Sequence, residues 1–300
     1  MKSFQIPICL SSVVAFSAMI LPANAQTYDM FVTGYNSGDV YEVTSSGDVS
    51  VFASGLSHPQ GLVADAAGDL FVADVGHNSI YKFTPSAIKS TFATGLNTPN
   101  GLTFDSLGNL YEADYGSSNI FEFSPSGAKS TFAVLSNRPN GLAVDSSGNL
   151  YEADRANVIN KFSSTGESTF TAGLSDPYGL AFDSSGDLFE ADATGNKIYE
   201  ISSSGTKSVF VSGLNHPDGL AFDGAGDLFE ADYNSGDIYE FVDSSGTLSS
   251  TPVLFASGLN GPEFIAFAPV PEPATEGILV IAAISLFSFQ RILQKNSRVR

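Results

Sequence analysis

This chain of 300 residues has little cysteine and few basic residues, and each of these shortages excludes a class of site or partner. The one cysteine, Cys9, lies in an apolar N-terminal run, so the rest of the chain can form no disulfide and no thiolate metal site. There are 13 Lys and Arg against 32 Asp and Glu, which gives a formal net charge of −19. A surface of that sign repels phosphate backbones, so nucleic acid is not an expected partner, whereas cations, sugars and small neutral molecules are compatible.

The N-terminus has the features of a secretory signal peptide, residues 1–25. Lys2 precedes an apolar run over residues 6–21, and Ala-Asn-Ala at 23–25 follows as a cleavage site with small residues at its first and third positions. Cleavage before Gln26 would begin the mature chain there. The alternative is an uncleaved membrane anchor, for which the apolar run is short.

Residues 271–300 have the features of a second targeting segment. Pro-Glu-Pro at 271–273 precedes an unbroken apolar and small-residue run over 277–289, and four basic residues follow position 290. This order resembles the PEP-CTERM sorting signal of Gram-negative bacteria. The resemblance implies recognition by exosortase-type machinery, transient contact of the tail with the inner membrane, and an extracellular or cell-surface destination. The alternative is a plain C-terminal membrane anchor. Both interpretations place the body, residues 26–270, outside the cytoplasm.

Between these ends one short phrase recurs at a regular distance. It reads HPQGL, TPNGL, RPNGL, DPYGL, HPDGL and, in altered form, GPEFI. Its proline falls at 59, 99, 139, 177, 217 and 262, so the spacings are 40, 40, 38, 40 and 45 residues. Each copy contains four short strand-like runs separated by Gly, Ser, Asn and Pro. A four-stranded unit of ~40 residues predicts a β-propeller, because one such sheet cannot bury its own faces.

The two ends of the repeat array predict the number of blades. Residues 29–53 match the last three strands of a copy, and residues 257–268 match only its first strand. Joined together, these two pieces complete a composite blade. We therefore expect an all-β fold, a six-bladed propeller with four antiparallel strands per blade, closed by pairing the two ends of the mature chain.

The repeated pattern PxGLAFDxxGNLYEAD…NxIYxF resembles the NHL-repeat and SMP-30/gluconolactonase group of propellers over nearly all of 29–268. The chain has no Trp, so the Trp-Asp pair typical of WD40 propellers is absent. In SMP-30-like enzymes, the residue before the Gly of the innermost strand helps to hold a divalent metal, often calcium, in the channel. The resemblance implies a channel ring of six polar side chains: Gln60, Asn100, Asn140, Tyr178, Asp218 and Glu263.

Four members of this ring are candidate metal ligands, because Ca²⁺ and similar divalent cations take several oxygen ligands. They are Glu263, Asp218, Asn100 and Asn140. The family's enzymes carry Glu and two Asn on the corresponding blades, but they carry a metal-binding Asp where this chain has Tyr178. Asp218 and Glu263 are also the candidate catalytic residues. The competing interpretation is that this position merely needs polar residues to line a wet channel.

Acidic residues also recur elsewhere in the unit. Asp65 and Asp74, with their counterparts in the other copies, end the first two strands, which favours turn-capping because a catalytic residue is needed only once. Four glutamates recur in the middle of the second strand: Glu112, Glu152, Glu190 and Glu230. For these we expect a hydrogen bond to Ser, Thr or a backbone amide of the next blade.

Two histidines, His58 and His216, precede the proline of their phrases and are expected at the same channel mouth, on blades too far apart to share a metal. No Ser-His-Asp order or phosphate-binding glycine loop occurs in the body. The sequence therefore favours a binding or interaction module of the cell exterior, with extracellular polysaccharide or a small neutral ligand as partner. The alternatives are a calcium-dependent lactonase-type hydrolase and a purely structural envelope or extracellular-matrix protein.

Overall fold

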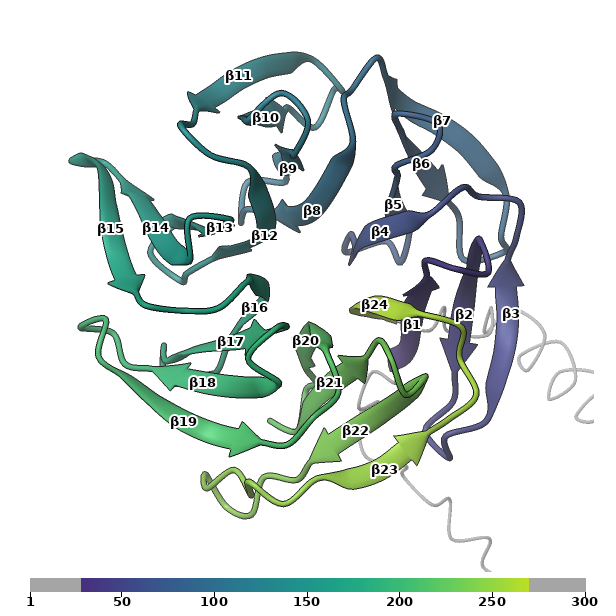
Figure 1. Cartoon of the computed structure of the whole chain (residues 1–300). Coiled ribbons are helices and arrows are strands. Elements are labelled where there is room, and N and C mark those ends of the chain that lie inside the picture. Colours follow the sequence, from purple (N-terminus) through teal and green to yellow (C-terminus); the bar gives the residue numbers. More distant parts are fainter. Residues whose placement is uncertain (1–27, 270–300) are drawn as a thin grey trace, which may run out of the picture.

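The repeats fold into six small sheets arranged around a common axis (Figure 1). The computed structural model describes residues 28–269. The predicted signal peptide (1–25) and sorting segment (271–300) lie outside the described residues. Every helix or strand element over 28–269 is a strand, and none of these residues forms a helix that could cross a membrane.

Each sheet contributes one strand to the wall of the central channel and one strand to the outer rim. The innermost strands are β4 (Pro59–Ala64), β8 (Pro99–Phe104), β12 (Pro139–Val144), β16 (Pro177–Phe182), β20 (Pro217–Phe222) and β24 (Pro262–Pro269). The second strands are β5 (Leu70–Asp74), β9 (Leu110–Asp114), β13 (Leu150–Asp154), β17 (Leu188–Asp192), β21 (Leu228–Asp232) and β1 (Tyr28–Gly34).

The outer half of each blade has two further strands. The third strands are β6 (Ser79–Phe83), β10 (Asn119–Phe123), β14 (Val158–Ser163), β18 (Lys197–Ile201), β22 (Asp237–Phe241) and β2 (Asp39–Val43). The outermost are β7 (Lys89–Thr94), β11 (Lys129–Val134), β15 (Gly166–Ala172), β19 (Lys207–Ser212), β23 (Val253–Ala256) and β3 (Val49–Ala53).

The sixth sheet joins the two ends of the described chain. Its strand order is β24-β1-β2-β3, and β24 runs antiparallel to β1 with Tyr28 opposite Pro269 and Phe31 opposite Ala266. In Figure 1, the yellow-green strand β24 lies beside the purple strand β1. The prediction of six four-stranded blades closed by a composite blade is therefore confirmed.

Turns that recur from copy to copy connect the strands within each blade. Oδ1 of Asp65 accepts hydrogen bonds from the backbone N–H groups of Ala67 and Asp69, at 2.9 and 3.0 Å. Gly68 in the same turn has φ of +83°, a conformation that glycine adopts without strain. Asp74, which is fully buried, accepts from the backbone N–H of Ser57 at 3.1 Å. Turn-capping by both sets of aspartates is thus confirmed at these positions.

Apolar side chains fill the seams between neighbouring blades. Phe189 of one blade meets Phe210 of the same blade and Phe222 of the next blade edge-to-face, with ring centroids 5.2 and 5.3 Å apart. Edge-to-face contacts of this kind add to the stabilisation from burial. Equivalent aromatic groups occur in other seams, so each blade is held mainly by its two neighbours.

The four mid-strand glutamates lie in these seams and are fully buried. The predicted interblade hydrogen bond is wrong within the described residues, because neither carboxyl oxygen of Glu112, Glu190 or Glu230 has a hydrogen-bond partner. Glu152 accepts one hydrogen bond, from Nδ2 of Asn160 at 3.1 Å, and Asn160 belongs to its own blade. Burial raises the pKa of all four well above the usual range, to about 8 for Glu152. They are therefore held as neutral carboxylic acids.

Candidate functional site

The recurring phrase begins the innermost strand of every blade, and a close backbone contact explains why five of the six copies keep its glycine; the sixth copy has Phe264. A Cβ on Gly141 would overlap the backbone carbonyl oxygen of Tyr178 on the next blade. Gly61, Gly101, Gly179 and Gly219 face the corresponding backbone in the same way. Any larger residue would push neighbouring innermost strands apart, so glycine is required where these backbones approach. The residue before it has no such constraint.

Three of the six predicted ring residues meet directly across the channel. Nε2 of Gln60 donates to the hydroxyl oxygen of Tyr178 at 2.8 Å, and this hydroxyl donates to Oε2 of Glu263 at 2.9 Å. Gln60 is the second residue of β4, and Tyr178 is the second residue of β16, three blades away in a ring of six. The tyrosine side chain therefore spans the channel. Tyr178 therefore blocks the central channel at the level of the polar ring residues.

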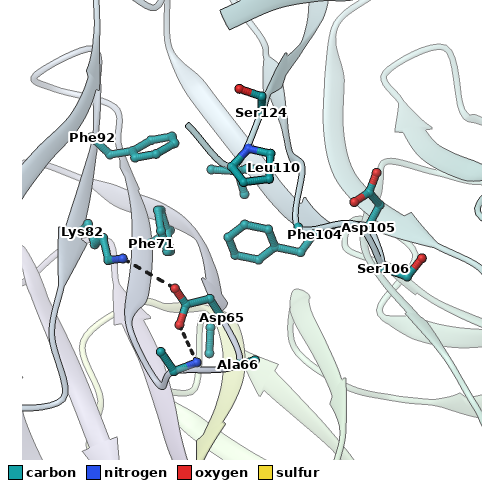
Figure 2. A pocket seen from close by; sticks show the side chains of 14 residues that line it. Asp65, Ala66, Phe71, Lys82, Phe92, Phe104, Asp105, Ser106, Leu110 and Ser124 are labelled. Carbon is teal, nitrogen blue, oxygen red and sulfur yellow. Dashed lines mark hydrogen bonds and ion pairs between the residues drawn. The ribbon is translucent and has the colours of Figure 1, made fainter. Parts of the chain in front are cut away.

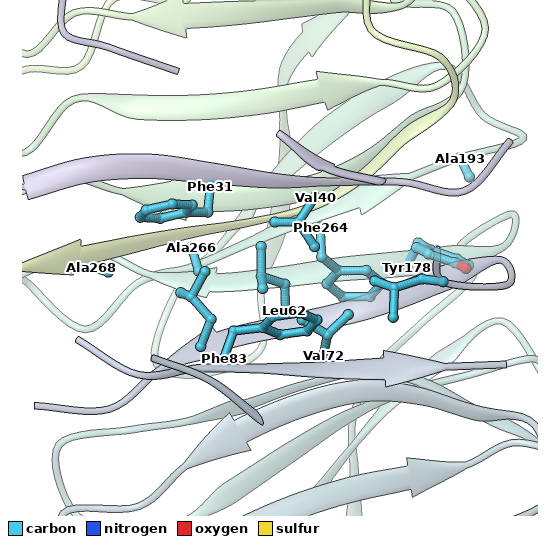
Figure 3. Close-up of a cluster of buried hydrophobic side chains, with 12 residues drawn as sticks. Phe31, Val40, Leu62, Val72, Phe83, Tyr178, Ala193, Phe264, Ala266 and Ala268 are labelled. Carbon is cyan, nitrogen blue, oxygen red and sulfur yellow. The ribbon is translucent and has the colours of Figure 1, made fainter. Parts of the chain in front are cut away.

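Packing holds Tyr178 in that position. Its ring lies 5.6 Å from the ring of Phe264, centroid to centroid, and only 8% of the residue is exposed. Figure 3 shows Tyr178 at one edge of a buried cluster that includes Leu62 and Val72, with its hydroxyl oxygen pointing away from the apolar side chains. The ring thus seals the apolar part of the channel, and the hydroxyl is presented to the polar part.

A small cavity of 220 Å³ lies at this polar mouth. From the ring it is lined by Gln60, Asn100, Asn140 and Tyr178. Three amide oxygens on these residues are buried without a donor: Oε1 of Gln60, Oδ1 of Asn100 and Oδ1 of Asn140. Nδ2 of Asn140 donates to the carbonyl oxygen of Pro177 at 3.0 Å, which fixes the orientation of that amide. Buried acceptors without donors are costly, so this cavity is suited to a ligand that brings hydrogen-bond donors.

Loop residues complete the cavity, and sequence reasoning missed them. Tyr35, Val75, Tyr115 and Arg155 directly follow the second strand of four different blades, and all four line the cavity. Nη1 of Arg155 lies 3.1 Å from Oδ1 of Asp176. A signal was present in the sequence, because this position varies among Tyr, Val, Arg and Ala directly after the repeated Ala-Asp pair or its equivalent.

The two ring carboxylates lie apart from this cavity, since neither Asp218 nor Glu263 lines it. Oδ1 of Asp218 is 2.9 Å from Nδ1 of His216, a contact that is short but poorly directed for a hydrogen bond. Burial raises the pKa of Asp218 to about 6, against the opposing effect of His216. Burial and the charge of Asp218 raise the pKa of Glu263, and burial raises that of Tyr178. Both carboxyl groups therefore take up a proton at a higher pH than an exposed carboxylate does.

The two histidines take the places expected of them at the mouth. His58 stacks against Tyr35 with ring centroids 4.7 Å apart, and His216 stacks against Tyr233 at 5.5 Å. Tyr35 and Tyr233 lie 6.3 Å apart between them. The histidines are therefore separated by two tyrosines and form part of an aromatic rim.

The four predicted metal ligands divide into two pairs with respect to the mouth cavity. Asn100 and Asn140 line the mouth cavity, whereas Asp218 and Glu263 do not, and Glu263 is already bonded to Tyr178. Over residues 28–269, no group of three or more His, Cys, Asp or Glu side chains is arranged to hold a metal ion. The four residues therefore do not share this cavity, and the Tyr178 hydroxyl takes a position that a cation held by Glu263 would need. Calcium binding by the ring stays a prediction that titration can test.

A second, larger cavity of 480 Å³ lies in one seam of the propeller (Figure 2). Phe71, Phe92 and Phe104 form its apolar walls, and Lys82 pairs with Asp65 at 3.6 Å at its edge. A smaller cavity of 240 Å³, lined by two phenylalanines and turn residues, lies in another seam. The polar groups of the larger cavity belong to turns and ion pairs of the repeat, so we assign it no ligand.

Comparison with known proteins supports the fold and leaves the activity open. No protein-family model matches the chain, and no curated protein matches it. Among solved structures, a chain of a nidogen/laminin complex is similar with a TM-score of 0.71 and 18% identity, covering 81% of this chain and 98% of that chain. A streptogramin B lyase gives a TM-score of 0.64 and 17% identity, covering 80% of this chain and 87% of that one.

A gluconolactonase from Xanthomonas campestris is also similar, with a TM-score of 0.59 and 16% identity, covering 77% of this chain and 88% of that chain. These neighbours share the overall fold of this chain, whose six blades are seen in its own sheet topology. At such low identity the likeness concerns the fold alone, and a propeller scaffold carries many unrelated activities.

Proposed function

We propose that this protein is an exported, surface-sorted binding module whose mouth cavity holds a small uncharged group rich in hydroxyls, such as one sugar unit of an extracellular polysaccharide. One observation carries the proposal: three residues that line a single cavity each have a buried amide oxygen without a donor. Hydroxyl groups of a sugar would supply those donors, and the second N–H of an amide group would in turn serve its acceptors.

Size and charge favour the same class of ligand. At ~30 Å³ per water molecule, a cavity of 220 Å³ has room for about seven waters, which suits one small ring better than a long polymer segment. Tyr35 and Tyr115 add flat apolar faces with a polar tip. The net charge of −19 disfavours an anionic ligand. A neutral polyol at the end of a chain is the best match.

Export and sorting enter the proposal from the sequence. The secretory signal over 1–25 and the PEP-CTERM-like segment over 271–300 would deliver the propeller to the outside of a Gram-negative cell through exosortase-type machinery. Polysaccharide is abundant in that location, and one rigid propeller per chain would then present one mouth to it.

Binding of neutral, acidic and amino sugars, measured by calorimetry on the exported protein, tests the proposal. We expect a neutral sugar to bind, and Asn100→Ala to weaken that binding by about tenfold, since a lost hydrogen bond is worth about 1–1.5 kcal/mol. Asn119→Ala is the matched control, because Asn119 lies on β10 of the same blade and does not line the cavity. Sugar binding unchanged by both Asn100→Ala and Asn140→Ala would remove the proposal, as would no binding of any sugar.

A second candidate is a lactonase-type hydrolase, for which the His216–Asp218 pair is the favouring observation. A carboxyl group with a pKa of about 6 beside a histidine can exchange a proton near neutral pH. Asp218 and Glu263 would be its catalytic residues, and calcium its expected cofactor. Turnover of simple lactones that disappears in Asp218→Asn would promote this candidate. A protein that neither binds sugars nor opens lactones would have the purely structural role.

A further inference from the structure

We infer that Tyr178 is the specificity-determining residue of the ring: its hydroxyl takes the central position and links Gln60 to Glu263, so the site excludes divalent cations. The inference concerns the same mouth as the proposed function, but it does not depend on which ligand enters the cavity.

The direction of the two hydrogen bonds carries the first step. The hydroxyl of Tyr178 has one proton, and it donates this proton to Oε2 of Glu263 at 2.9 Å. Its oxygen must then accept, and Nε2 of Gln60 donates to it at 2.8 Å. A cation at this position would instead attract the oxygen of Gln60. Oε1 of Gln60 is turned away and remains buried without a partner, so the amide is set for a phenol and not for an ion.

The second step of the argument is the position of the Tyr178 side chain. Tyr178 is buried, packs on Phe264, and spans the channel between opposite blades. A divalent ion at the centre would have to displace the hydroxyl that bonds to both Gln60 and Glu263. Asn100 and Asn140 lie on the cavity side, and Asp218 and Glu263 do not line the cavity. The amides are thereby left to a ligand without the carboxylates that a calcium site needs.

Charge supplies the third step. Only two of the six ring residues, Asp218 and Glu263, carry carboxyl groups, and Asp218 already lies 2.9 Å from His216. Calcium sites in proteins gain affinity with the number of charged oxygen ligands. Replacing the phenol by a carboxylate would add a third charge at the centre and open the bore at the same time. Tyr178→Asp should therefore convert the ring from a hydroxyl site to a cation site.

Thermal unfolding and calorimetry with calcium chloride test the inference on the exported protein. We expect the wild-type Tm not to respond to millimolar calcium, and the Tm of Tyr178→Asp to rise with the logarithm of the calcium concentration. Tyr115→Asp is the matched control, because it adds the same charge to the same cavity without opening the bore, and it should gain no calcium response. Tyr178→Phe keeps the ring and loses the hydroxyl; it should have a lower Tm and no calcium response.

Two results would overturn the inference. The first is stoichiometric calcium binding by the wild-type protein that Glu263→Gln abolishes. The second is a folded Tyr178→Asp variant that shows no calcium response. If Tyr178→Asp does not fold, the wild-type titration decides: calcium binding lost in Glu263→Gln refutes the inference, and no binding together with a lowered Tm of Tyr178→Phe supports it. Failure of sugar binding would leave this outcome unchanged, since calcium is the only probe.

Discussion

Ionising the buried seam glutamates should destabilise the propeller, and Glu152 allows the size of the effect to be worked out. Burial, followed by the charge of Asp154, raises its pKa from 4.5 to about 8. The native state then keeps a proton that the unfolded state releases, so stability is full below pH ~4.5 and falls as pH rises toward ~8. A shift of about 3.5 units at ~1.4 kcal/mol per unit corresponds to about 5 kcal/mol.

This loss is large compared with the ~5–15 kcal/mol that stabilises a typical domain. Urea unfolding followed by circular dichroism at several pH values between 4.5 and 8 measures it. Glu152→Gln keeps the shape of the side chain and cannot ionise. The free energy of unfolding of this variant should therefore exceed that of the wild type by an amount that grows toward about 5 kcal/mol as the pH rises.

The matched control is Glu122→Gln, at a partly exposed position of β10, and it should follow the wild-type pH dependence. The change of net charge with pH affects the stability of the wild type and of both variants almost equally. It therefore cancels when the free energy of unfolding of a variant is compared with that of the wild type at the same pH. If the difference between wild type and Glu152→Gln stays constant over this pH range, Glu152 ionises at its ordinary pKa in the native state. The reasoning about neutral acids in the seams would then be refuted.

Two further substitutions test the frame of the repeat. Asp192→Ala removes a fully buried carboxylate that accepts hydrogen bonds from two backbone N–H groups, and it should lower the free energy of unfolding by about 3 kcal/mol in urea titration. An unchanged urea midpoint would contradict turn-capping. Gly141→Ala should cost about 1–3 kcal/mol because its Cβ meets the Tyr178 carbonyl, while Gly224→Ala, which meets nothing within 4 Å, should be nearly neutral in the same assay.

The fold could be predicted because the copies repeat the same turn and strand residues at the same spacing. The repeated proline and glycine mark where each innermost strand begins, and the Asp-x-x-Gly turns mark where it reverses. Residues 29–53 lack the first strand of a copy, and residues 257–268 supply only a first strand. Each piece can be completed only by the other, so the number of strands predicted that the ring closes by pairing them. Strand pairing depends on the backbone and on turn residues, which the sequence displays directly.

The partners of buried side chains could not be predicted, because they depend on what the neighbouring sheet presents. Recurrence of Glu112 and its counterparts shows that the position tolerates a carboxyl group, but Asn160 as the partner of Glu152 occurs in one blade only. The sequence likewise placed Tyr178 on the ring without showing that its length carries the hydroxyl across to Gln60. Reach across a channel is set by side-chain length and by the channel's width together.

Within the recurring phrase, one position is constrained by packing and the position before it varies. Binding can therefore change at the variable position without disturbing the fold. In five of the six phrases the glycine is required by the adjacent backbone, so its replacement perturbs the ring of strands; the sixth phrase has Phe264 there. The residue before it touches mainly the channel, so Gln, Asn, Tyr, Asp and Glu are all accommodated there. Because one large member, Tyr178, bonds to two others, the six positions are not independent. A change at Tyr178 should therefore alter the chemistry of the whole mouth, whereas a change at Asn100 should alter one hydrogen bond.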